Sequence, residues 1–396
     1  MNEIRHVQLS EIAELITKGT TPTTLGYQFQ DEGVNFLKIE CFDENGNFIE
    51  DKATHISIEC HEKLKRSQLK AGDILFSIAG AIGRVAIVTE DMLPANTNQA
   101  LAIIRISDDD IYLPYIKLIL TSPIIEKQFG KKKQGVAQLN LSLKDINELS
   151  IPLPDRDSQV EYADLFSKVR AIIDQRNLEL KSLDDLVKAR FVEMFGTYPS
   201  NEKGWGVGTI RDLVTEVRYG SSRKAADGDS GKYPYLRMNN ITYGGELDLT
   251  DTKTIDIPDE ELDKCAVRRG DLLFNRTNSK ELVGKTCVYN RDEMMVLAGF
   301  VVRVRLNDRA LPEFVSAFLN TDFSKQMLLN MCKAAIGQAN INAQELQNIG
   351  IYIPPIELQK EFVSFKAQVD KSKAAVQKSL DETQLLFDSL MQKFFG

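Results

Sequence analysis

The sequence predicts an α+β protein in which two similar globular units are separated by an antiparallel coiled coil of two long helices. Three observations predict this fold: an internal repeat at a shift of 200 residues, short β-rich runs inside each copy, and a long helical stripe that ends each copy. A chain of 396 residues is also about two to three times the usual domain size, so at least two hydrophobic cores are expected. The predicted segments are globular units at 1–156 and 197–356, and coiled-coil helices at 157–196 and 357–396.

The repeat is clearest over residues 140–196, which align without a gap on residues 340–396. NLSLKDINELSIPLPDRDSQVEY falls on NINAQELQNIGIYIPPIELQKEF, and both copies end in Phe-Gly. Earlier segments pair at nearly the same shift: LKAGDILFS (69–77) with VRRGDLLFN (267–275), and LPYIKLIL (113–120) with LPEFVSAF (311–318). A self-match of this extent predicts two copies of one fold.

Short β-rich runs separated by Gly, Asn and Asp turns predict the strands of the first globular unit. These runs are 34–40, 73–79, 85–90 and 100–106, and helices are expected near 113–129 and 144–149. IPLP and IYIPP then require extended backbone just before each long helix, because proline disfavours helical geometry in the residue before it. Strands and helices in this mixture indicate a compact α+β unit.

The two long helices are predicted at about 157–195 and 357–395. An alternating three-four step runs along the first helix through positions 159, 162, 166, 169, 173, 176, 180, 183, 187, 190 and 194, and along the second helix in the same register. Such a stripe is too long to be buried in one small unit, which favours pairing of the helices over two separate core helices. Because the first helix ends where the second unit begins, paired helices must run antiparallel, over roughly 58 Å at 1.5 Å per residue.

Composition excludes several classes of protein. Hydrophobic residues make up 43% of the chain and charged residues 27%, which is typical of a globular protein, and no apolar window approaches 18 residues. Charged residues near the N-terminus, such as Glu3 and Arg5, argue against a signal peptide, so a cytoplasmic location is expected. Five cysteines without a CxxC pair argue against a disulfide framework, and Cys41, His55, Cys60 and His61 have spacing too irregular for a typical zinc site.

Two related units on a spacer suit a linear ligand with two separated sites, and B-DNA is the obvious candidate. The net charge of −8 does not exclude DNA, because a binding surface needs only a local basic stripe. Polar and basic loops recur at matching places in both copies, and they carry the residue types that read base edges. The candidate contacts are Thr20, Thr21, Lys38, Asn96, Asn98, Lys131, Lys132 and Gln138 in the first unit, and Ser222, Arg223, Lys224, Arg237, Asn239, Asn275, Arg276 and Asn278 in the second.

The chain resembles the specificity (S) subunit of type I restriction-modification systems. The resemblance rests on IPLPDRDSQVEY and IPPIELQKEF at the starts of the long helices, on KAGDILFS and RRGDLLFN, and on the N-terminal LSEIAELITKGTTP. It covers essentially the whole chain; one departure is Asp155 in the first copy where the second has Pro355.

The resemblance implies two target-recognition domains that bind a split, asymmetric DNA site, with a spacer set by the helices. It also implies docking of two adenine-N6 methyltransferase subunits, which would carry S-adenosylmethionine, and of restriction and translocase subunits beyond them. No cofactor is expected in this chain itself. Specificity subunits of type IIB-like enzymes share this architecture and remain an alternative.

Motifs that look catalytic are weak. SKELVGKT (279–286) ends like a phosphate-binding P-loop but has Ser at the position of the first glycine. Pro354 and Pro355 are flanked by isoleucines and lack the polar and aromatic groups of an amino-methyltransferase loop. Asp73 and Asp271 lie in matching KAGD and RRGD turns, where closing the turn is the favoured role. The sequence therefore predicts a non-catalytic subunit, with a P-loop enzyme and a purely structural coiled-coil scaffold as less favoured alternatives.

Overall fold

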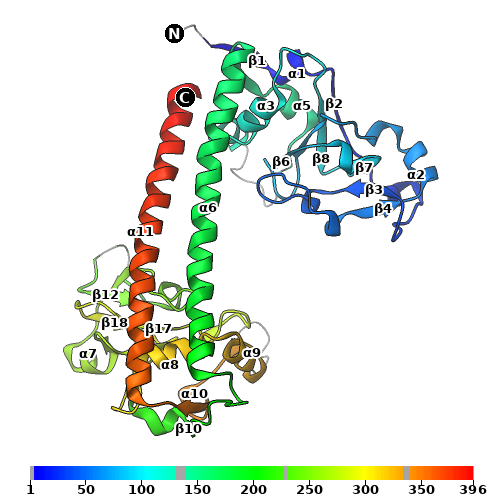
Figure 1. Cartoon of the computed structure of the whole chain (residues 1–396). Helices are drawn as coiled ribbons and strands as arrows, with labels where there is room; N and C mark the ends of the chain where they lie inside the picture. The colour runs from blue at the N-terminus through cyan, green and yellow to red at the C-terminus, as the bar shows by residue number, and fades with distance from the viewer. Residues whose placement is uncertain (1–3, 131–139, 227, 229, 333–338, 396) are drawn as a thin grey trace. The chain divides into compact units, whose positions relative to one another are not determined.

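The computed structural model describes residues 4–130, 140–226, 228, 230–332 and 339–395. The chain divides into two compact units, each built from a globular part and one portion of each long helix (Figure 1). Unit 1 comprises residues 1–175 and 380–396, and unit 2 comprises residues 176–379. Unit 1 is therefore built from two separate stretches of the chain, and unit 2 from one continuous stretch.

Unit 1 contains two main sheets and a short strand pair. The first sheet has the order β2–β8–β5–β6 and the second β4–β3–β7, while β1 pairs with β9. The strands are β1 (Arg5–Gln8), β2 (Leu15–Lys18), β3 (Val34–Leu37), β4 (Thr54–Ile56), β5 (Ile74–Ser77), β6 (Val85–Ile87), β7 (Ala95–Thr97), β8 (Leu101–Arg105) and β9 (Ser150–Leu153). The helices are α1 (Leu9–Ile12), α2 (Ile58–Lys63), α3 (Leu113–Leu120), α4 (Pro123–Gly130) and α5 (Leu143–Asn147).

Unit 2 repeats this topology, and its described residues form three further short strands. Its sheets have the orders β11–β19–β15–β17 and β13–β12–β18–β14, with pairs β10–β21 and β16–β20. The strands are β10 (Gly206–Thr209), β11 (Val214–Tyr219), β12 (Tyr233–Leu236), β13 (Lys253–Ile255), β14 (Ala266–Val267), β15 (Leu272–Asn275), β16 (Thr277–Asn278), β17 (Thr286–Val288), β18 (Met295–Leu297), β19 (Val301–Leu306), β20 (Ala339–Asn340) and β21 (Gly350–Ile353). The helices are α7 (Asp259–Cys265), α8 (Pro312–Leu319), α9 (Asp322–Met331) and α10 (Ala343–Gln347). The predicted duplication is confirmed.

The predicted strands lie where the sequence places them but are shorter. The run 73–79 becomes β5 (Ile74–Ser77), and the run 85–90 becomes β6 (Val85–Ile87). The helix expected near 113–129 is divided into α3 and α4, because the chain leaves helical hydrogen bonding at Thr121 and restarts at Pro123. Both long helices are continuous, α6 from Arg156 to Phe195 and α11 from Ile356 to Phe395.

The helices pair antiparallel within each unit. In unit 1, the ring of Tyr162 lies 4.6 Å from that of Phe394, and Phe166 lies 5.2 Å from Phe387. In unit 2, the rings of Phe191 and Phe362 are 5.3 Å apart, and Lys373 Nζ lies 2.6 Å from Asp184 Oδ1. Residue numbers rise along α6 where they fall along α11, which confirms the predicted direction of pairing. Every position of the predicted stripe is buried or half-buried in both helices.

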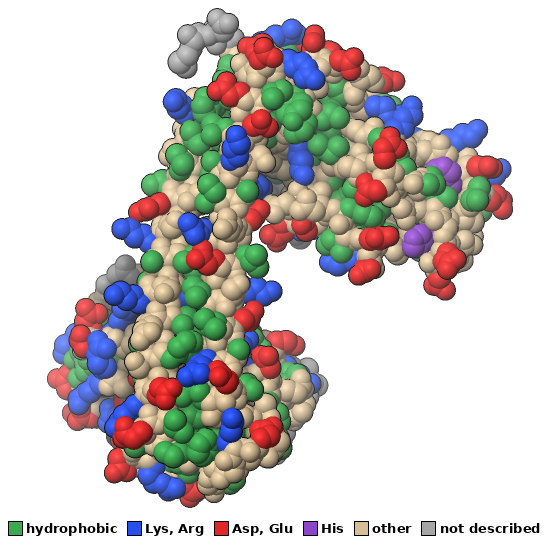
Figure 2. Space-filling model, in the orientation of Figure 1, with side chains coloured by type: hydrophobic (Ala, Val, Ile, Leu, Met, Phe, Trp, Pro, Cys, Tyr) green, Lys and Arg blue, Asp and Glu red, His purple; other side chains and the backbone are tan. Residues whose placement is uncertain are grey.

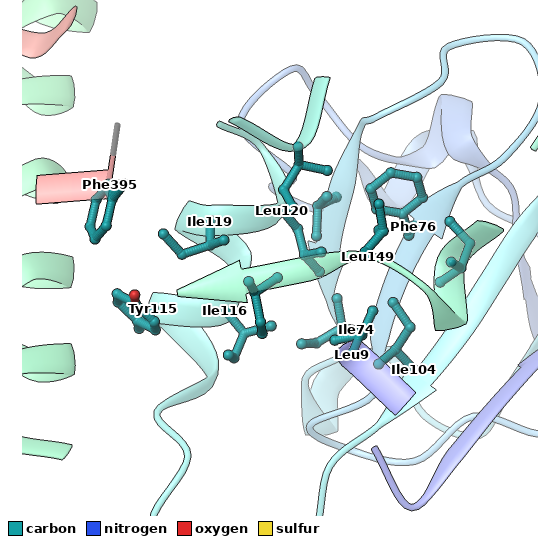
Figure 3. Packing of buried hydrophobic residues seen from close by; sticks show 14 of the residues in the cluster. Leu9, Ile74, Phe76, Ile104, Tyr115, Ile116, Ile119, Leu120, Leu149 and Phe395 are labelled. Carbon is teal, nitrogen blue, oxygen red and sulfur yellow. The ribbon is translucent and has the colours of Figure 1, made fainter. Parts of the chain in front are cut away.

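The core of unit 1 joins its sheets and short helices to the end of α11. Leu9, Ile74 and Ile104 are buried together at its centre (Figure 3). Tyr115 of α3 lies at the edge of this core, and its ring centroid is 6.0 Å from that of Phe395, the last residue of α11. The C-terminal end of α11 and the N-terminal segment thus contribute to the same hydrophobic core.

A buried glutamine at the start of each long helix fixes that helix to its globular part. Gln159 Oε1 accepts from the backbone N–H of Tyr112 at 2.9 Å, and its amide nitrogen donates to the carbonyl of Pro154. In unit 2, Gln359 makes the equivalent bonds to the Leu311 N–H and the Pro354 carbonyl, both at 2.9 Å. The repeated proline-to-glutamine motif is therefore a structural connection.

Candidate nucleic-acid interface

In unit 1, several candidate residues lie around the ends of two parallel strands. β3 and β7 pair in parallel, with Leu37 opposite Thr97, so Lys38 and Asn98 leave the sheet next to each other. The Thr97 hydroxyl donates to the Leu37 carbonyl at 2.7 Å, which fixes the two strand ends. Lys38 is half-buried and places its ammonium 4.7 Å from the centre of the Phe29 ring.

Gly19 brings a third segment against these strand ends. A β-carbon at Gly19 would lie 2.1 Å from the Thr97 carbonyl oxygen, so only glycine fits here. The crossing is held by the Thr20 N–H, which donates to the same carbonyl at 3.0 Å. Thr20 and Thr21 therefore lie beside Asn98, and the Thr21 hydroxyl contacts Gln99. The structure thus gathers Thr20, Thr21, Lys38 and Asn98 from three segments.

Unit 2 builds the same surface from different side chains. Leu236 of β12 pairs in parallel with Leu297 of β18, and Arg237 follows β12 as Lys38 follows β3. Gly220 makes the equivalent crossing, since a β-carbon there would lie 2.2 Å from the Leu297 carbonyl oxygen. Ser222 and Arg223 follow this crossing and are exposed.

Arg237 and Arg223 are held by carboxylates. The Arg237 guanidinium donates to the Asp251 carboxylate at 2.8 Å and to the Asp251 carbonyl at 2.9 Å. Arg223 makes two hydrogen bonds to Glu261, at 2.7 and 3.2 Å, and this pairing raises the pKa of the Arg223 guanidinium. These carboxylates hold the arginines in one orientation. A base or phosphate that binds either arginine would have to displace the carboxylate or share the guanidinium with it. Asn239 and Lys224 are exposed near the same strand ends.

Arg276 forms an aromatic and basic surface with two residues that the sequence analysis did not select. Its guanidinium lies 5.0 Å from the centre of the Tyr219 ring, and its backbone N–H donates to the Phe300 carbonyl at 3.0 Å. Tyr219 is 44% exposed and Phe300 is 52% exposed, which is unusual for large aromatic side chains. Tyr219 begins the loop YGSSRK, so its place beside a basic loop was the available signal.

Two candidate asparagines are buried and hold backbone instead of facing solvent. Asn96 donates to the Ser67 hydroxyl at 3.0 Å and to the Leu64 carbonyl at 3.1 Å, so it fixes the turn after α2 against β7. Asn275 is also fully buried; with its amide oriented to satisfy both atoms, it donates to the Phe300 and Thr277 carbonyls and accepts from half-buried Asn278. These two side chains support the loops: Asn96 lies in β7, which pairs in parallel with β3, and Asn275 lies in β15, between β19 and β17. Lys131, Lys132 and Gln138 lie outside the described residues.

Charge is distributed locally. Figure 2 shows Lys and Arg side chains interspersed with Asp and Glu on the visible face of each unit, without one large basic field. In the described part of unit 2, Arg276 makes no ion pair, which leaves its charge available to a ligand. This distribution favours DNA contacts through a few placed cations over attraction by overall charge.

The residues of the motifs that resemble catalytic sites have structural roles. Lys285 Nζ donates to the Met238 carbonyl at 2.8 Å, and the Thr286 hydroxyl donates to the Gly284 carbonyl at 3.0 Å, so neither group faces a phosphate-binding loop. Asp73 accepts from the Lys70 N–H and Asp271 from the Arg268 N–H, which confirms their turn-closing role. Each aspartate also pairs with an arginine of the neighbouring strand, Arg105 or Arg305.

The residues considered for metal binding are separated by their packing. Cys41 donates its Sγ hydrogen to the Lys52 carbonyl, and His61 contacts Asn96. Among residues that the structure describes, no group of three or more His, Cys, Asp or Glu is arranged to hold a metal ion. In the same described ranges, no helix is long and apolar enough to cross a membrane.

Sequence comparison matches the chain twice to one family, described as the type I restriction modification DNA specificity domain, over residues 1–182 and 202–383. The chain is 22% identical over 304 residues to the Escherichia coli K12 type I restriction enzyme EcoKI specificity subunit, covering 72% of this chain and 65% of that protein. It is 31% identical over 170 residues to the Escherichia coli EcoBI specificity subunit, covering 41% of this chain and 35% of that protein. The matches thus span less than two thirds of these relatives' lengths.

Two solved structures share the fold over the whole chain. One, from work on complex assembly and conformational transition of the type I R-M system, has a TM-score of 0.59 at 19% identity and covers 99% of this chain and 96% of its own. The other is the type I restriction-modification system S subunit from M. genitalium, with a TM-score of 0.51 at 14% identity and coverage of 100% and 97%.

Proposed function

The chain belongs to the family of type I restriction-modification DNA specificity proteins, and on this premise we propose that it is a non-catalytic subunit that reads a bipartite, asymmetric DNA site. Unit 1 reads one half of the site and unit 2 reads the other. The subunit determines which DNA sequence is bound, while partner chains carry out the chemistry.

One observation carries this proposal: the same strand-end surface is built twice, with the same backbone and different side chains. Gly19 and Gly220 make the same close crossing, and Lys38 and Arg237 follow equivalent strands. The position that Asn98 occupies in unit 1 is occupied by Ala298 in unit 2. A duplicated surface with altered side chains fits two half-sites of different sequence.

The side chains have the chemistry that base recognition needs. Arginine can donate two hydrogen bonds to guanine and asparagine can pair with adenine, and each such contact gives about 1–3 kcal/mol of discrimination. Exposed Lys224 and the aromatic and basic surface of Tyr219, Arg276 and Phe300 suit contacts to phosphates and to base or sugar faces. The buried asparagines, Asn96 and Asn275, position these loops from below.

The partners follow from the same proposal. Two adenine-N6 methyltransferase subunits dock on this chain and bring S-adenosylmethionine, and restriction and translocase subunits join that assembly. Outward residues of α6 and α11, around 170–188 and 371–388, provide the docking faces. The assembly works in the cytoplasm, where its DNA lies.

The test is reconstitution of the full chain with its methyltransferase, followed by mapping of modified adenines in a DNA of random sequence. We expect methylation confined to one split motif with a fixed spacer. Methylation without sequence preference, or none above that of the methyltransferase alone, would contradict the proposal. A structural scaffold would give complex formation without sequence-selective protection of DNA.

A further inference from the structure

Unit 2 contains a cavity of about 330 Å³ that the proposed DNA surface does not use. It lies between the helix pair and the globular part of this unit. Its walls come from α6 (181–191), α11 (366–373), the turn at 243–246 and the α8–α9 junction (316–325). Apolar side chains, Val187 and Phe191, line it together with several charged groups. A volume of this order suits a small molecule or ion.

Lys325 of α9 is the unusual group in this wall. Its Nζ is buried and has no hydrogen-bond partner among the described residues. The nearest feature is the face of the Tyr243 ring, whose centre is 4.7 Å from Nζ. A buried ammonium without a hydrogen-bonding partner is costly, so natural proteins usually pair such a group or give it a ligand.

Neighbouring lysines increase the local positive charge. Burial, followed by the charges of Lys285 and Lys188, lowers the pKa of Lys325 to about 8 from an ordinary value of 10.5. Lys285 is itself buried, and its Nζ donates to the Met238 carbonyl at 2.8 Å. Lys188 lines the cavity from α6.

Four of the five carboxylates that line the cavity pair with other lysines, and the fifth, Asp185, makes no ion pair with Lys325 in the described structure. Asp184 and Glu246 both contact Lys373, which is only 15% exposed. On the remaining sides, Asp370 pairs with Lys366 at 2.6 Å, and Asp322 lies 3.3 Å from Lys188. Lys280 and Glu281 line a second pocket, to which Lys325 also contributes. The described acidic groups around the cavity therefore leave Lys325 without a direct counter-ion.

A second unsatisfied atom lies in the same wall. The amide nitrogen of Asn320 donates to the carbonyls of Thr286 at 2.8 Å and Ser316 at 2.9 Å, which fixes the orientation of the amide. Its Oδ1 is buried and accepts no hydrogen bond from the described residues. The wall of the cavity thus holds one unpaired cationic donor and one unpaired acceptor.

We propose that this cavity binds a small anion, a phosphate group or the carboxylate of a small molecule, through Lys325. The anion neutralises Lys325 at the point where α9, the 243–246 turn and the two long helices of unit 2 meet. It therefore stabilises the attachment of the globular part of unit 2 to its helix pair, independently of DNA reading.

The test is calorimetric titration of the full chain with inorganic phosphate and, separately, with acetate, comparing wild type with Lys325→Met. Lys181→Met is the matched control, because it removes the same charge from an exposed lysine of the same cavity. We expect at least one probe to bind, with affinity reduced tenfold or more by Lys325→Met and less than twofold by Lys181→Met. The preferred probe distinguishes a phosphate group from a carboxylate.

The pH dependence gives a readout that a purely structural lysine would not produce. Lys325 is charged below its pKa of about 8, and a bound anion raises that pKa, so affinity should hold at neutral pH and fall at higher pH. Acetate keeps its charge over this range and isolates the effect. Lys325→Arg keeps the charge; it should retain binding and move its loss to higher pH, and it serves as the test if Lys325→Met does not fold.

Absence of binding by both probes, or equal affinity in wild type and Lys325→Met, would overturn the proposal. These results are independent of DNA reading, which is measured by methylation mapping. A failure of one therefore does not imply a failure of the other.

Discussion

At the scale of single residues, equivalent positions have the same backbone role and different chemistry. Lys38 and Arg237 each follow an inner strand, β3 or β12, that pairs in parallel with its neighbour, and each lies next to a crossing glycine. Lysine offers a point charge and arginine a planar set of donors, so the two positions suit different targets. We therefore expect the side chain at this place to contribute to the specificity of each unit.

We predict that Arg237→Gln relaxes the recognition of one half-site. Loss of a two-donor contact should reduce discrimination at one base position by about 1–3 kcal/mol, or roughly fivefold to 150-fold. Methylation of DNA libraries randomised in either half measures the effect. Lys38→Gln is the matched control and should alter only the other half; equal weakening of both halves by Arg237→Gln would refute the two-unit assignment.

A second residue-scale prediction concerns Glu216, which pairs with Arg303 at 3.0 Å and Arg305 at 2.9 Å. A hydrogen bond from Arg218, aided by the charges of Arg303 and Arg305, lowers the pKa of Glu216 from 4.5 despite its partial burial. A lowered folded-state pKa stabilises the fold above the unfolded-state pKa, and this contribution is lost as pH falls through the folded value.

Glu216→Gln should therefore destabilise unit 2 by about 1.5–3 kcal/mol at pH 7, because Arg303 is 2% exposed and loses its charged partner. The difference from wild type should shrink below pH 4.5. Urea unfolding at a series of pH values measures it, with Glu260→Gln, an exposed carboxylate of α7, as the control. A difference that stays constant down to the lowest pH at which the protein folds would contradict the assignment.

At the scale of elements, the long helices depend on their first turns. Gln359 is fully buried and bonds three backbone groups, the Leu311 N–H and the carbonyls of Arg309 and Pro354. Gln159 repeats the arrangement in unit 1. Side-chain bonds of this kind satisfy backbone groups of the proline turn and fix the angle at which each helix leaves its unit.

Gln359→Leu should destabilise unit 2, because its similar volume keeps the packing while the three backbone groups lose their partner. Each buried group left unsatisfied costs about 1–3 kcal/mol. Hydrogen exchange should show faster exchange at the Leu311 amide, which loses its acceptor. Gln344→Leu at an exposed position of α10 is the control, and unchanged protection at Leu311 would show that Gln359 does not hold this turn.

At the scale of the whole molecule, the proposed function requires an acidic protein with a net charge of −8 to bind a polyanion. Because positive and negative side chains are mixed on the visible surface, we expect contacts to phosphates to come from a few placed lysines and arginines (Figure 2). Binding of this kind releases counterions from DNA and weakens steeply as salt concentration rises.

We predict that Lys224→Gln lowers the slope of log affinity against log salt by about 0.9, the value for one phosphate contact. Sequence preference should stay unchanged, because phosphate contacts carry no base information. Fluorescence anisotropy over a salt series measures the slope in the reconstituted complex. Lys203→Gln, an exposed lysine outside the strand-end surface, should leave the slope unchanged; a parallel loss in both variants would point to overall charge instead.

The sequence by itself determined the duplication, the two long helices and their antiparallel pairing, because repeats and heptad stripes are local patterns that survive without knowledge of packing. It also located the loops that meet at the strand ends, and Thr20, Lys38, Ser222 and Arg237 lie there. Their contact with DNA stays a prediction.

Only the tertiary structure decided which polar side chains face solvent. Asn96 and Asn275 look like readers in the sequence, yet long-range strand pairing buries both beneath the loops. For the same reason the sequence did not reveal Tyr219 and Phe300, which tertiary packing leaves exposed beside Arg276. It also did not reveal Lys325, whose burial depends on elements more than a hundred residues away. Burial is a property of what the rest of the chain brings to a residue, and composition and spacing do not contain it.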